Sequence, residues 1–206
     1  MSEGKDNAGY VLLVFIGILL AAGIFIFFHD PVTAVEDNYQ YSNGKTLFNV
    51  TKVSDTETFI TLYVGKNEQP YAIDMRNDPL SLENITVEGM VNTRIYGDDI
   101  VYITINPNAN LSAKTTIAAL EIDKIIDNPL LYNISVRSAM TLPNDYGYPV
   151  KSCSDGTDTS TVIWLTLGSE TTVYTENYCI VVVGTNEDEL IRAADRLVYQ
   201  LLGIMK

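Results

Sequence analysis

The longest uninterrupted apolar stretch of the chain lies close to its amino terminus. Residues 10–28 read YVLLVFIGILLAAGIFIFF, which is 19 positions without a charged side chain. At about 1.5 Å per helical residue this segment reaches roughly 28 Å, close to the hydrocarbon thickness of a bilayer. A helix in a soluble core normally carries a polar stripe, and this segment has none. The pattern predicts a transmembrane helix over residues 10–28.

A cleaved signal peptide is the alternative interpretation of the same segment. Signal peptides have an apolar region of about 7–15 residues after a basic stretch. Here the apolar run is longer and only Lys5 precedes it, although Val32-Thr33-Ala34 would suit a cleavage site. The anchor interpretation is therefore preferred. Because Lys5 lies on the short side and the next basic residue is Lys45, the positive-inside rule places residues 1–9 in the cytoplasm and the remainder outside.

Alternation of apolar and polar positions begins after a juxtamembrane linker over residues 29–38. Asn43-Gly44 lies between two arms with aromatic residues, which is a strong hairpin signal because a type I′ turn needs two residues with positive φ. Residues 58–64 alternate and are rich in β-branched and aromatic side chains, and residues 70–75 provide a further strand. Residues 39–97 are expected to form the β-rich part of the ectodomain, an antiparallel meander.

After residue 97 the pattern changes to alternating strands and helices. Ser112 is a candidate N-cap for a helix that ends before Asn128-Pro129. We expect residues 98–206 to form the α/β part of the ectodomain, so the fold class is α+β (or α/β), a meander plus a mixed sheet with two packed helices. The apolar face of the first helix contains Ala118, Ile122, Ile125 and Ile126. Compact apolar runs typical of buried strands occupy residues 99–105, 132–140, 161–167 and 178–183.

The most regular pattern lies at the carboxyl end, where residues 187–202 predict an amphipathic helix. Thr185 with Asp188 matches a capping box, and Gly203 suits the position just after a helix. We expect the helix to dock on the strand over residues 178–183, because a short connection keeps neighbouring elements adjacent. Its apolar face consists of Leu190, Ile191, Ala194, Leu197, Val198, Leu201 and Leu202.

Composition narrows the class of protein. The chain has 206 residues, 47% of them hydrophobic, with 13 Lys+Arg against 26 Asp+Glu and a net charge of −13. That apolar content is enough for a folded core, and the acidic balance argues against nucleic acid as a partner. Because His29 is the single histidine, multi-histidine metal centres are excluded. A single histidine also argues against acid–base catalysis that relies on a histidine relay. The place of His29 beside the apolar segment fits interfacial anchoring.

Two further features suit an extracytoplasmic location. Cys153 and Cys179 are an even pair, and a disulfide between them would close a loop of about 27 residues. Unpaired buried thiols and a redox pair are the alternatives, although the pair lacks the CxxC spacing of redox sites. Acceptor motifs for N-glycosylation occur at Asn49, Asn84, Asn110 and Asn133.

Charged residues of the predicted ectodomain are the remaining candidates for chemistry. Asp98-Asp99 precede a strand, and Asp155-Gly156-Thr157-Asp158 offer oxygens to Ca²⁺, but an EF-hand loop needs more carboxylates and a bidentate Glu. Polar turns are the simpler interpretation of both. Arg192, Asp195 and Arg196 form a polar row beside the apolar face of the last helix, which predicts a solvated or partner-facing stripe. No catalytic residue, cofactor or metal ligand is assigned.

Five segments, taken together with the N-terminal span and the Cys153/Cys179 pair, are distinctive. They are RNDP (76–79), ENITVEG (83–89), VYITINP (101–107), KTTIAALEIDKII (114–126) and GTNEDELIRAADRLVYQLLGI (184–204). This combination resembles a family of small, uncharacterised, single-pass archaeal membrane proteins, and the last segment is its most specific part. The resemblance implies an archaeal surface setting and no assigned activity, cofactor or catalytic residue.

The sequence therefore predicts a membrane-anchored ectodomain with a non-catalytic structural or interaction role at the cell envelope. Its expected partners are the lipid bilayer, through residues 10–28, and other envelope or membrane proteins. An accessory or ligand-binding subunit of a membrane complex is the alternative, since Gly17 and Gly23 would let the span pack against another helix. An enzyme that uses carboxylates alone is the third class, and its candidate residues are Asp98, Asp99, Asp155 and Asp158.

Overall fold

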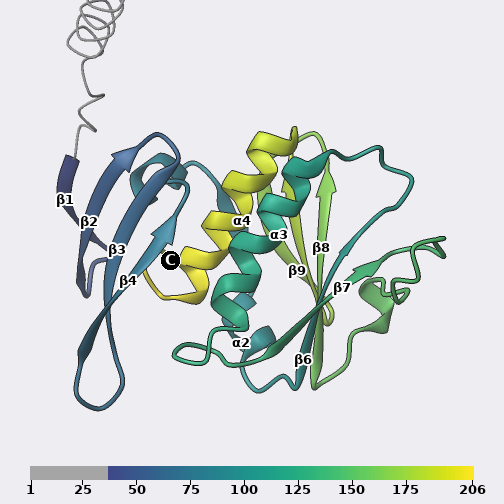
Figure 1. Cartoon of the computed structure of the whole chain (residues 1–206), viewed down its shortest axis with the longest axis horizontal. Coiled ribbons are helices and arrows are strands. Elements are labelled where there is room, and N and C mark those ends of the chain that lie inside the picture. Colours follow the sequence, from purple (N-terminus) through teal and green to yellow (C-terminus); the bar gives the residue numbers. More distant parts are fainter. Residues whose placement is uncertain (1–36) are drawn as a thin grey trace, which may run out of the picture. The chain divides into compact units, whose positions relative to one another are not determined.

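The computed structural model describes residues 37–206, which belong to one compact unit (Figure 1). The transmembrane helix expected over residues 10–28 lies outside the described residues. None of the helices within residues 37–206 has the length and apolar character needed to cross a membrane. The first strand begins at Asp37, inside the stretch expected to be a linker.

The first sheet is the expected antiparallel meander of four strands, in the order β1-β2-β3-β4. Asn43 and Gly44 do lie in the β1–β2 hairpin, but the predicted type I′ turn is wrong. Of the two, only Gly44 has a positive φ, and the Asn43 side chain instead accepts hydrogen bonds from the main-chain nitrogens of Lys45 (2.9 Å) and Thr46 (2.8 Å). The strands are β1 (Asp37–Ser42), β2 (Leu47–Ser54), β3 (Glu57–Val64) and β4 (Gln69–Met75).

The second sheet is mixed, as expected, and has six strands in the order β5-β9-β10-β8-β6-β7. Strand β9 is antiparallel to β10, and the other neighbouring pairs are parallel. Four strands fall in the predicted apolar runs: β6 (Ile100–Ile105), β7 (Ser135–Met140), β8 (Ser160–Leu167) and β10 (Cys179–Gly184). The sequence pattern does not indicate β5 (Thr86–Glu88) or β9 (Thr172–Glu176), which are too short to show a clear period.

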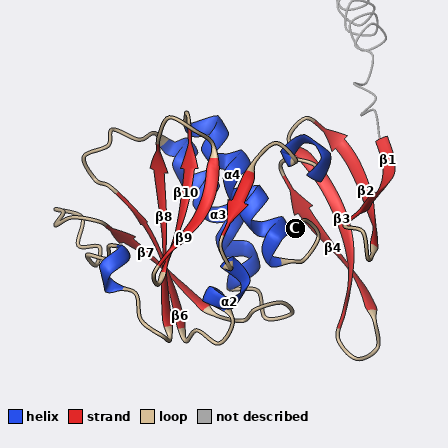
Figure 2. Ribbon diagram, turned by 180° about the vertical axis from the view of Figure 1, so that it is seen from behind, coloured by secondary structure: helices blue, strands red, loops and turns tan. Residues whose placement is uncertain are grey.

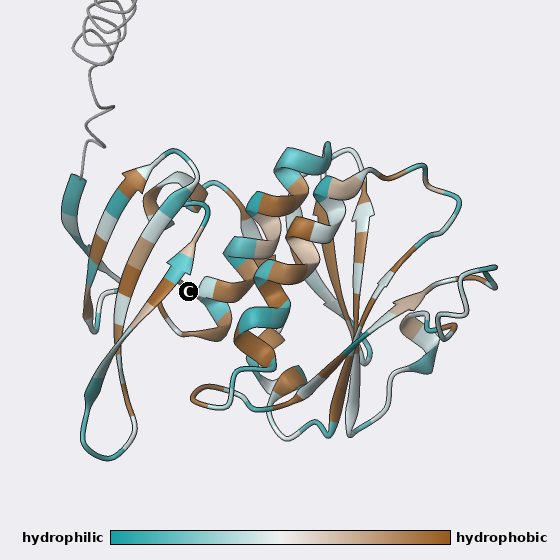
Figure 3. Cartoon of the chain, in the orientation of Figure 1, coloured by the Kyte–Doolittle hydropathy of each residue, from teal (hydrophilic) through white to brown (hydrophobic). Residues whose placement is uncertain are grey.

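Two long helices lie side by side between the two sheets, as Figures 1 and 2 show from opposite directions. Helix α3 (Ala113–Ile126) connects β6 to β7, and helix α4 (Glu187–Leu201) follows β10. Ser112 caps α3 as predicted, because its hydroxyl accepts from the main-chain nitrogen of Lys114 at 3.3 Å. The predicted apolar faces of both helices are buried in one core with residues of both sheets, and Figure 3 shows hydrophobic positions along these elements.

Shorter helical elements complete the chain. Helix α2 (Val91–Ile95) precedes β6, and single 3₁₀ turns form η1 (Pro79–Leu82) after β4 and η2 (Cys153–Asp155) before β8. The α+β class and the meander-plus-mixed-sheet arrangement predicted from the sequence are therefore confirmed for residues 37–206.

The N-terminus of α4 differs from the prediction by one residue. Asn186, rather than Thr185, is the N-cap, and its side-chain oxygen accepts from the main-chain nitrogens of Asp188 (2.9 Å) and Glu189 (3.0 Å). The helix starts very close to the strand before it, since a Cβ on Gly184 would lie 2.3 Å from the nitrogen of Leu190. The expected docking of α4 beside β10 is confirmed.

The polar row on α4 is the second correction, because most of it is buried rather than solvated. Asp195 is fully buried and Arg196 is 4% exposed, while Arg192 forms an ion pair with Glu189, one turn earlier, at 2.8 Å. Ten of the 15 residues of α4 are buried, so the helix is enclosed on more than its apolar face. The reason is the segment over residues 76–85, which leads out of the small sheet and covers the polar side of the helix.

Candidate functional site

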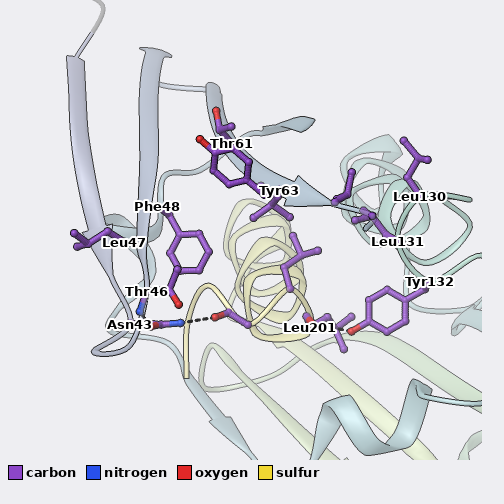
Figure 4. A pocket seen from close by; sticks show the side chains of 15 residues that line it. Asn43, Thr46, Leu47, Phe48, Thr61, Tyr63, Leu130, Leu131, Tyr132 and Leu201 are labelled. Atoms are coloured by element: carbon purple, nitrogen blue, oxygen red, sulfur yellow. Dashed lines mark hydrogen bonds between the residues drawn. The ribbon is translucent and has the colours of Figure 1, made fainter. Parts of the chain in front are cut away.

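The candidate site is an open groove where the small sheet meets the carboxyl end of α4 (Figure 4). We call it the α4 groove. Its volume is about 580 Å³, within the range of roughly 300–1,000 Å³ that is usual for ligand pockets. Its walls come from the β1–β2 loop, strands β2 and β3, the α3–β7 loop and the last turn of α4. The apolar residues along these walls include Leu47, Phe48, Leu62, Leu130, Leu131 and Leu202.

Side chains from three separate elements fix the end of α4 that forms the floor of the groove. The last carbonyls of a helix have no partner within it and must be satisfied from outside. Tyr132 donates to the carbonyl of Leu201 at 2.7 Å, and Asn43 donates to the carbonyl of Gly203 at 2.7 Å. Figure 4 shows these two residues on opposite sides of the helix end. Asn92, at the start of α2, donates to the carbonyl of Gln200 at 3.1 Å.

Large apolar side chains stand exposed among the residues that line the α4 groove. Leu47 is 61% exposed, Tyr63 is 65% exposed and Leu130 is 58% exposed. Leu47 on β2 and Tyr63 on β3 alternate with Phe48 and Leu62, which pack against the core, so their side chains lie on the outer face of the small sheet beside the groove. Leu130 lies on the α3–β7 loop, on the other side of the groove from Leu47 (Figure 4). Single exposed apolar residues are normal on a soluble surface, but an exposed leucine beside an apolar hollow indicates a place where another molecule can bind.

The chemistry of the α4 groove is uncharged. Its described lining residues include no Asp, Glu, Lys, Arg or His side chain. Burial raises the pKa of Tyr132 to about 12, so this phenol is a neutral donor across the physiological range. A groove of this kind suits a ligand that makes apolar contacts with the walls and hydrogen bonds with the groups at the edge.

The predicted disulfide is confirmed. Cys153 in η2 is bonded to Cys179 in β10, and their Cα atoms are 5.0 Å apart. Cys179 is fully buried, so the bridge ties the segment after β7 to the middle of the larger sheet. Disulfides persist in oxidising compartments, and this bond is therefore consistent with an extracytoplasmic location for residues 37–206.

Two of the four acidic residues considered for catalysis or metal binding, Asp98 and Asp155, are engaged in local structure. The buried carboxylate of Asp98 accepts from the main-chain nitrogen of Thr161 at 3.0 Å, and burial raises its pKa. The Asp155 carboxylate accepts from the nitrogen and hydroxyl of Ser152, each at 2.7 Å, and these bonds lower its pKa. Within residues 37–206 no group of three or more His, Cys, Asp or Glu side chains is arranged around a common metal position.

All four predicted glycosylation acceptors have exposed side chains: Asn49, Asn84, Asn110 and Asn133. They are therefore accessible from solvent, whereas their modification stays a prediction. Asn110 and Asn133 adopt positive φ angles of 50° and 55°, which places them at turns.

The residues of the α4 groove were not singled out from the sequence, although one signal pointed to them. Leu130-Leu131 directly follows Asn128-Pro129, so two large apolar residues occur in a turn where polar residues are usual. The exposure of Leu130 shows that the turn presents one of them to solvent.

Comparison with known proteins adds no relative to this description. No family model matches the chain, and neither the curated proteins nor the solved structures contain a match. The function has to be argued from the geometry of the chain itself.

Proposed function

We propose that this protein is a membrane-anchored extracytoplasmic ectodomain with a non-catalytic interaction role at the cell envelope, and that the α4 groove receives an apolar segment of a partner protein. The anchor in this proposal is the apolar segment over residues 10–28. The archaeal surface setting suggested by the sequence resemblance is part of the same proposal.

One observation carries the proposal: the half-buried Phe48 and Leu62 and the exposed Leu130 line an uncharged groove in a strongly acidic chain. Acidic side chains keep the rest of such a surface solvated. An exposed apolar patch without charges lowers the solubility of a protein. Such patches are therefore usually found where a partner molecule covers them.

The shape and chemistry of the groove suit a protein segment. It lies at the end of the β1–β2 hairpin opposite Asp37, because Leu47 pairs with Ser42 at the far end of β1. Side chains of a partner segment can enter the apolar hollow, and its main chain can form hydrogen bonds at the polar edge.

The proposal is tested by a photo-reactive residue at position 130, introduced into the full-length chain in intact cells. The matched control is position 167, because Leu167 is also an exposed leucine (42%) but does not line the groove. We expect a discrete cross-linked protein from position 130 and none from position 167. Leu130→Asp should abolish co-purification of that protein in mild detergent, and Leu167→Asp should not.

Equal cross-linking from the two positions, or co-purification that survives Leu130→Asp, would contradict a role for the groove. A stoichiometric membrane partner retained by the Leu130→Asp variant would instead favour the second candidate function. In that case the chain would be an accessory or ligand-binding subunit of a membrane complex, held through residues 10–28.

A further inference from the structure

A second pocket lies on the face of the larger sheet that is turned away from the helices. Along β8, Ile163 and Leu165 belong to the core that contains the helices, whereas Val162 and Trp164 belong to a separate cluster with Cys179. Successive side chains of a strand point to opposite faces, so Trp164 points away from α3 and α4. The pocket beside it has a volume of about 540 Å³. We call it the Trp164 pocket.

The Trp164 pocket is built from the centre of the sheet and from a segment that the disulfide holds in place. Trp164 is paired in register with Thr104 of β6 and with Val181 of β10, so it stands on a strand inside the sheet. Cys153, bonded to Cys179 of β10, contributes to the wall. The bridge thus ties a wall of the pocket to the sheet beneath it.

The indole of Trp164 presents carbon to the pocket rather than nitrogen. Its Nε1 atom is enclosed by protein and has no hydrogen-bond partner, while the side chain as a whole is partly exposed. The accessible part of the ring is therefore its carbon surface. Such a surface packs well against aliphatic C–H groups that carry a small positive charge, because the face of an aromatic ring is electron-rich.

Hydrogen-bonding groups surround this aromatic surface, and only one of them is charged. Asn106 and Asn177 provide amides, and Thr141, Ser152 and Ser154 provide hydroxyls, while Glu176 supplies the single carboxylate. Lys and Arg are absent from the described lining residues. Anions therefore lack the cationic groups that usually bind them. A quaternary ammonium ion would need more than one aromatic face, and Trp164 is the only aromatic residue among those described in the lining.

We propose that the Trp164 pocket binds a neutral saccharide. One face of a sugar ring consists of C–H groups and would lie on the indole, and its hydroxyls would exchange hydrogen bonds with the amides and hydroxyls around the rim. The layer of helices and the larger sheet separate this pocket from the α4 groove. The saccharide and the proposed protein partner therefore occupy different sites, and either proposal can fail without the other.

The chain carries its own reporter for this test, because Trp164 is its one tryptophan. The full-length chain is produced without N-linked glycans and kept in a polyoxyethylene ether detergent, since the headgroups of glycoside detergents are saccharides. Tryptophan emission and acrylamide quenching are followed during titration with a panel of neutral mono- and oligosaccharides, with choline and inorganic phosphate as controls. We expect a saturable emission change and protection from quenching with at least one neutral saccharide.

Variants then connect the signal to the pocket, with binding measured by calorimetry because Trp164→Leu has no reporter. Trp164→Leu should weaken binding roughly tenfold or more, since it removes the aromatic surface. Thr141→Val, which keeps the shape and removes one hydroxyl, should weaken binding several-fold, whereas Leu130→Asp in the α4 groove should have no effect. Glu176→Gln should change saccharide binding little, but it would abolish binding of a cation.

Three results would overturn the proposal: no response to any neutral saccharide of the panel, a response to choline or phosphate alone, or saccharide affinity that is unchanged in Thr141→Val and Trp164→Leu. If Trp164→Leu fails to fold, Thr141→Val and Leu130→Asp still decide the question, because both replace partly or well exposed side chains.

Discussion

The carboxyl group of Asp195 lies in the protein interior, where a negative charge is unfavourable. It lies in the middle of α4, fully buried, and its Oδ2 atom accepts from the main-chain nitrogen (2.9 Å) and the side-chain amide (2.8 Å) of Asn77. Burial, and after it the charge of Glu121, raises the pKa of Asp195 to about 8. Lys124 and the Asn77 bonds oppose this shift without cancelling it. At neutral pH the group is therefore mostly protonated.

The raised pKa of Asp195 predicts how stability depends on pH. The folded-state pKa of about 8 lies above the ordinary value of 3.8, so the folded state binds more protons than the unfolded state within this window. This group's contribution should therefore be greatest at low pH and decline as pH rises from about 4 to 8. Asp195→Asn keeps an acceptor for Asn77 and removes the titration. Its melting temperature should decline less steeply over that range than the wild-type value.

The control for this measurement is Asp188→Asn on the same helix, where the side chain is 70% exposed and paired with Lys114. That variant should retain the wild-type pH dependence. Identical pH profiles for Asp195→Asn and the wild-type protein would show that the buried carboxyl does not titrate between these values.

The burial of Asp195 shows what a helical pattern leaves out. The spacing of apolar residues in α4 correctly identifies the face that packs on the larger sheet. It cannot reveal a second covering surface, because that surface comes from Asn77 and its neighbours, more than a hundred positions earlier in the chain. The same limitation applies to Arg196, whose Nε donates to the carbonyl of Ile85 at 3.2 Å. Long-range covering of this kind leaves no local periodic signal.

At the scale of elements, α4 connects all parts of the described fold. Its N-terminal turn meets α3, where the Glu187 carboxylate accepts from the Ser112 nitrogen and the Thr115 hydroxyl, each at 2.7 Å. Near its carboxyl end, Tyr199 donates to the carbonyl of Asn77 at 2.6 Å, in the segment that follows the small sheet. Its last turn forms part of the α4 groove. A change in the packing of α4 should therefore affect the whole domain.

Replacing Leu197 tests this central role of α4. Leu197 is fully buried, so Leu197→Ala should lower the free energy of unfolding by about 2–5 kcal/mol through lost burial and a residual cavity. Leu120→Ala is the matched control, because Leu120 lies on α3 with 56% of its surface exposed and should change stability by less than about 0.5 kcal/mol. Urea unfolding of the two variants measures the difference. Equal, small effects would mean that α4 is not central to stability.

The contribution of the disulfide to the stability of the domain can be measured as well. A bridge that closes a loop of about 27 residues should stabilise the domain by roughly 3–4 kcal/mol through the entropy of the unfolded chain. Replacing Cys153 and Cys179 together by Ala should lower the unfolding free energy by about that amount. Reducing agent should have the same effect on the wild-type protein and none on the double variant. A wild-type protein indifferent to reduction would contradict this account.

Elements with a clear period could be predicted, and short ones could not. Both long helices and the strands of the meander follow from their apolar spacing, as does the Cys153–Cys179 pairing from its even count. Strand β5, with three residues, has no period to detect, and its partner β9 lies more than eighty positions away. The α4 groove and the Trp164 pocket could not be predicted, because each is made by loops that only the tertiary arrangement brings together.

At the scale of the whole molecule, the layered fold provides two separate surfaces. The α4 groove opens beside the small sheet, and the Trp164 pocket lies on the far face of the larger sheet, with the helices between them. One surface is apolar and suits a protein segment, whereas the other combines one aromatic ring with uncharged polar groups and a single carboxylate. A domain with this design would connect two different components of an envelope, which fits a structural or interaction role.

The topology of the full chain is the last prediction. The apolar run over residues 10–28, with Lys5 on its short side, should hold the protein in the membrane with residues 37–206 outside. An epitope in the exposed β3–β4 turn, residues 65–68, should be accessible to antibody and protease in intact cells, and an epitope at Met1 should become accessible only after lysis. The turn is preferable to the carboxyl end, where Ile204 and Met205 are buried. A soluble full-length form, or an epitope at 65–68 that is reached only from the cytoplasm, would disprove the anchor and its orientation. The Cys153–Cys179 bond argues against a cytoplasmic location of residues 37–206. In a reducing compartment the domain would lose this bond, which ties a wall of the Trp164 pocket to the sheet.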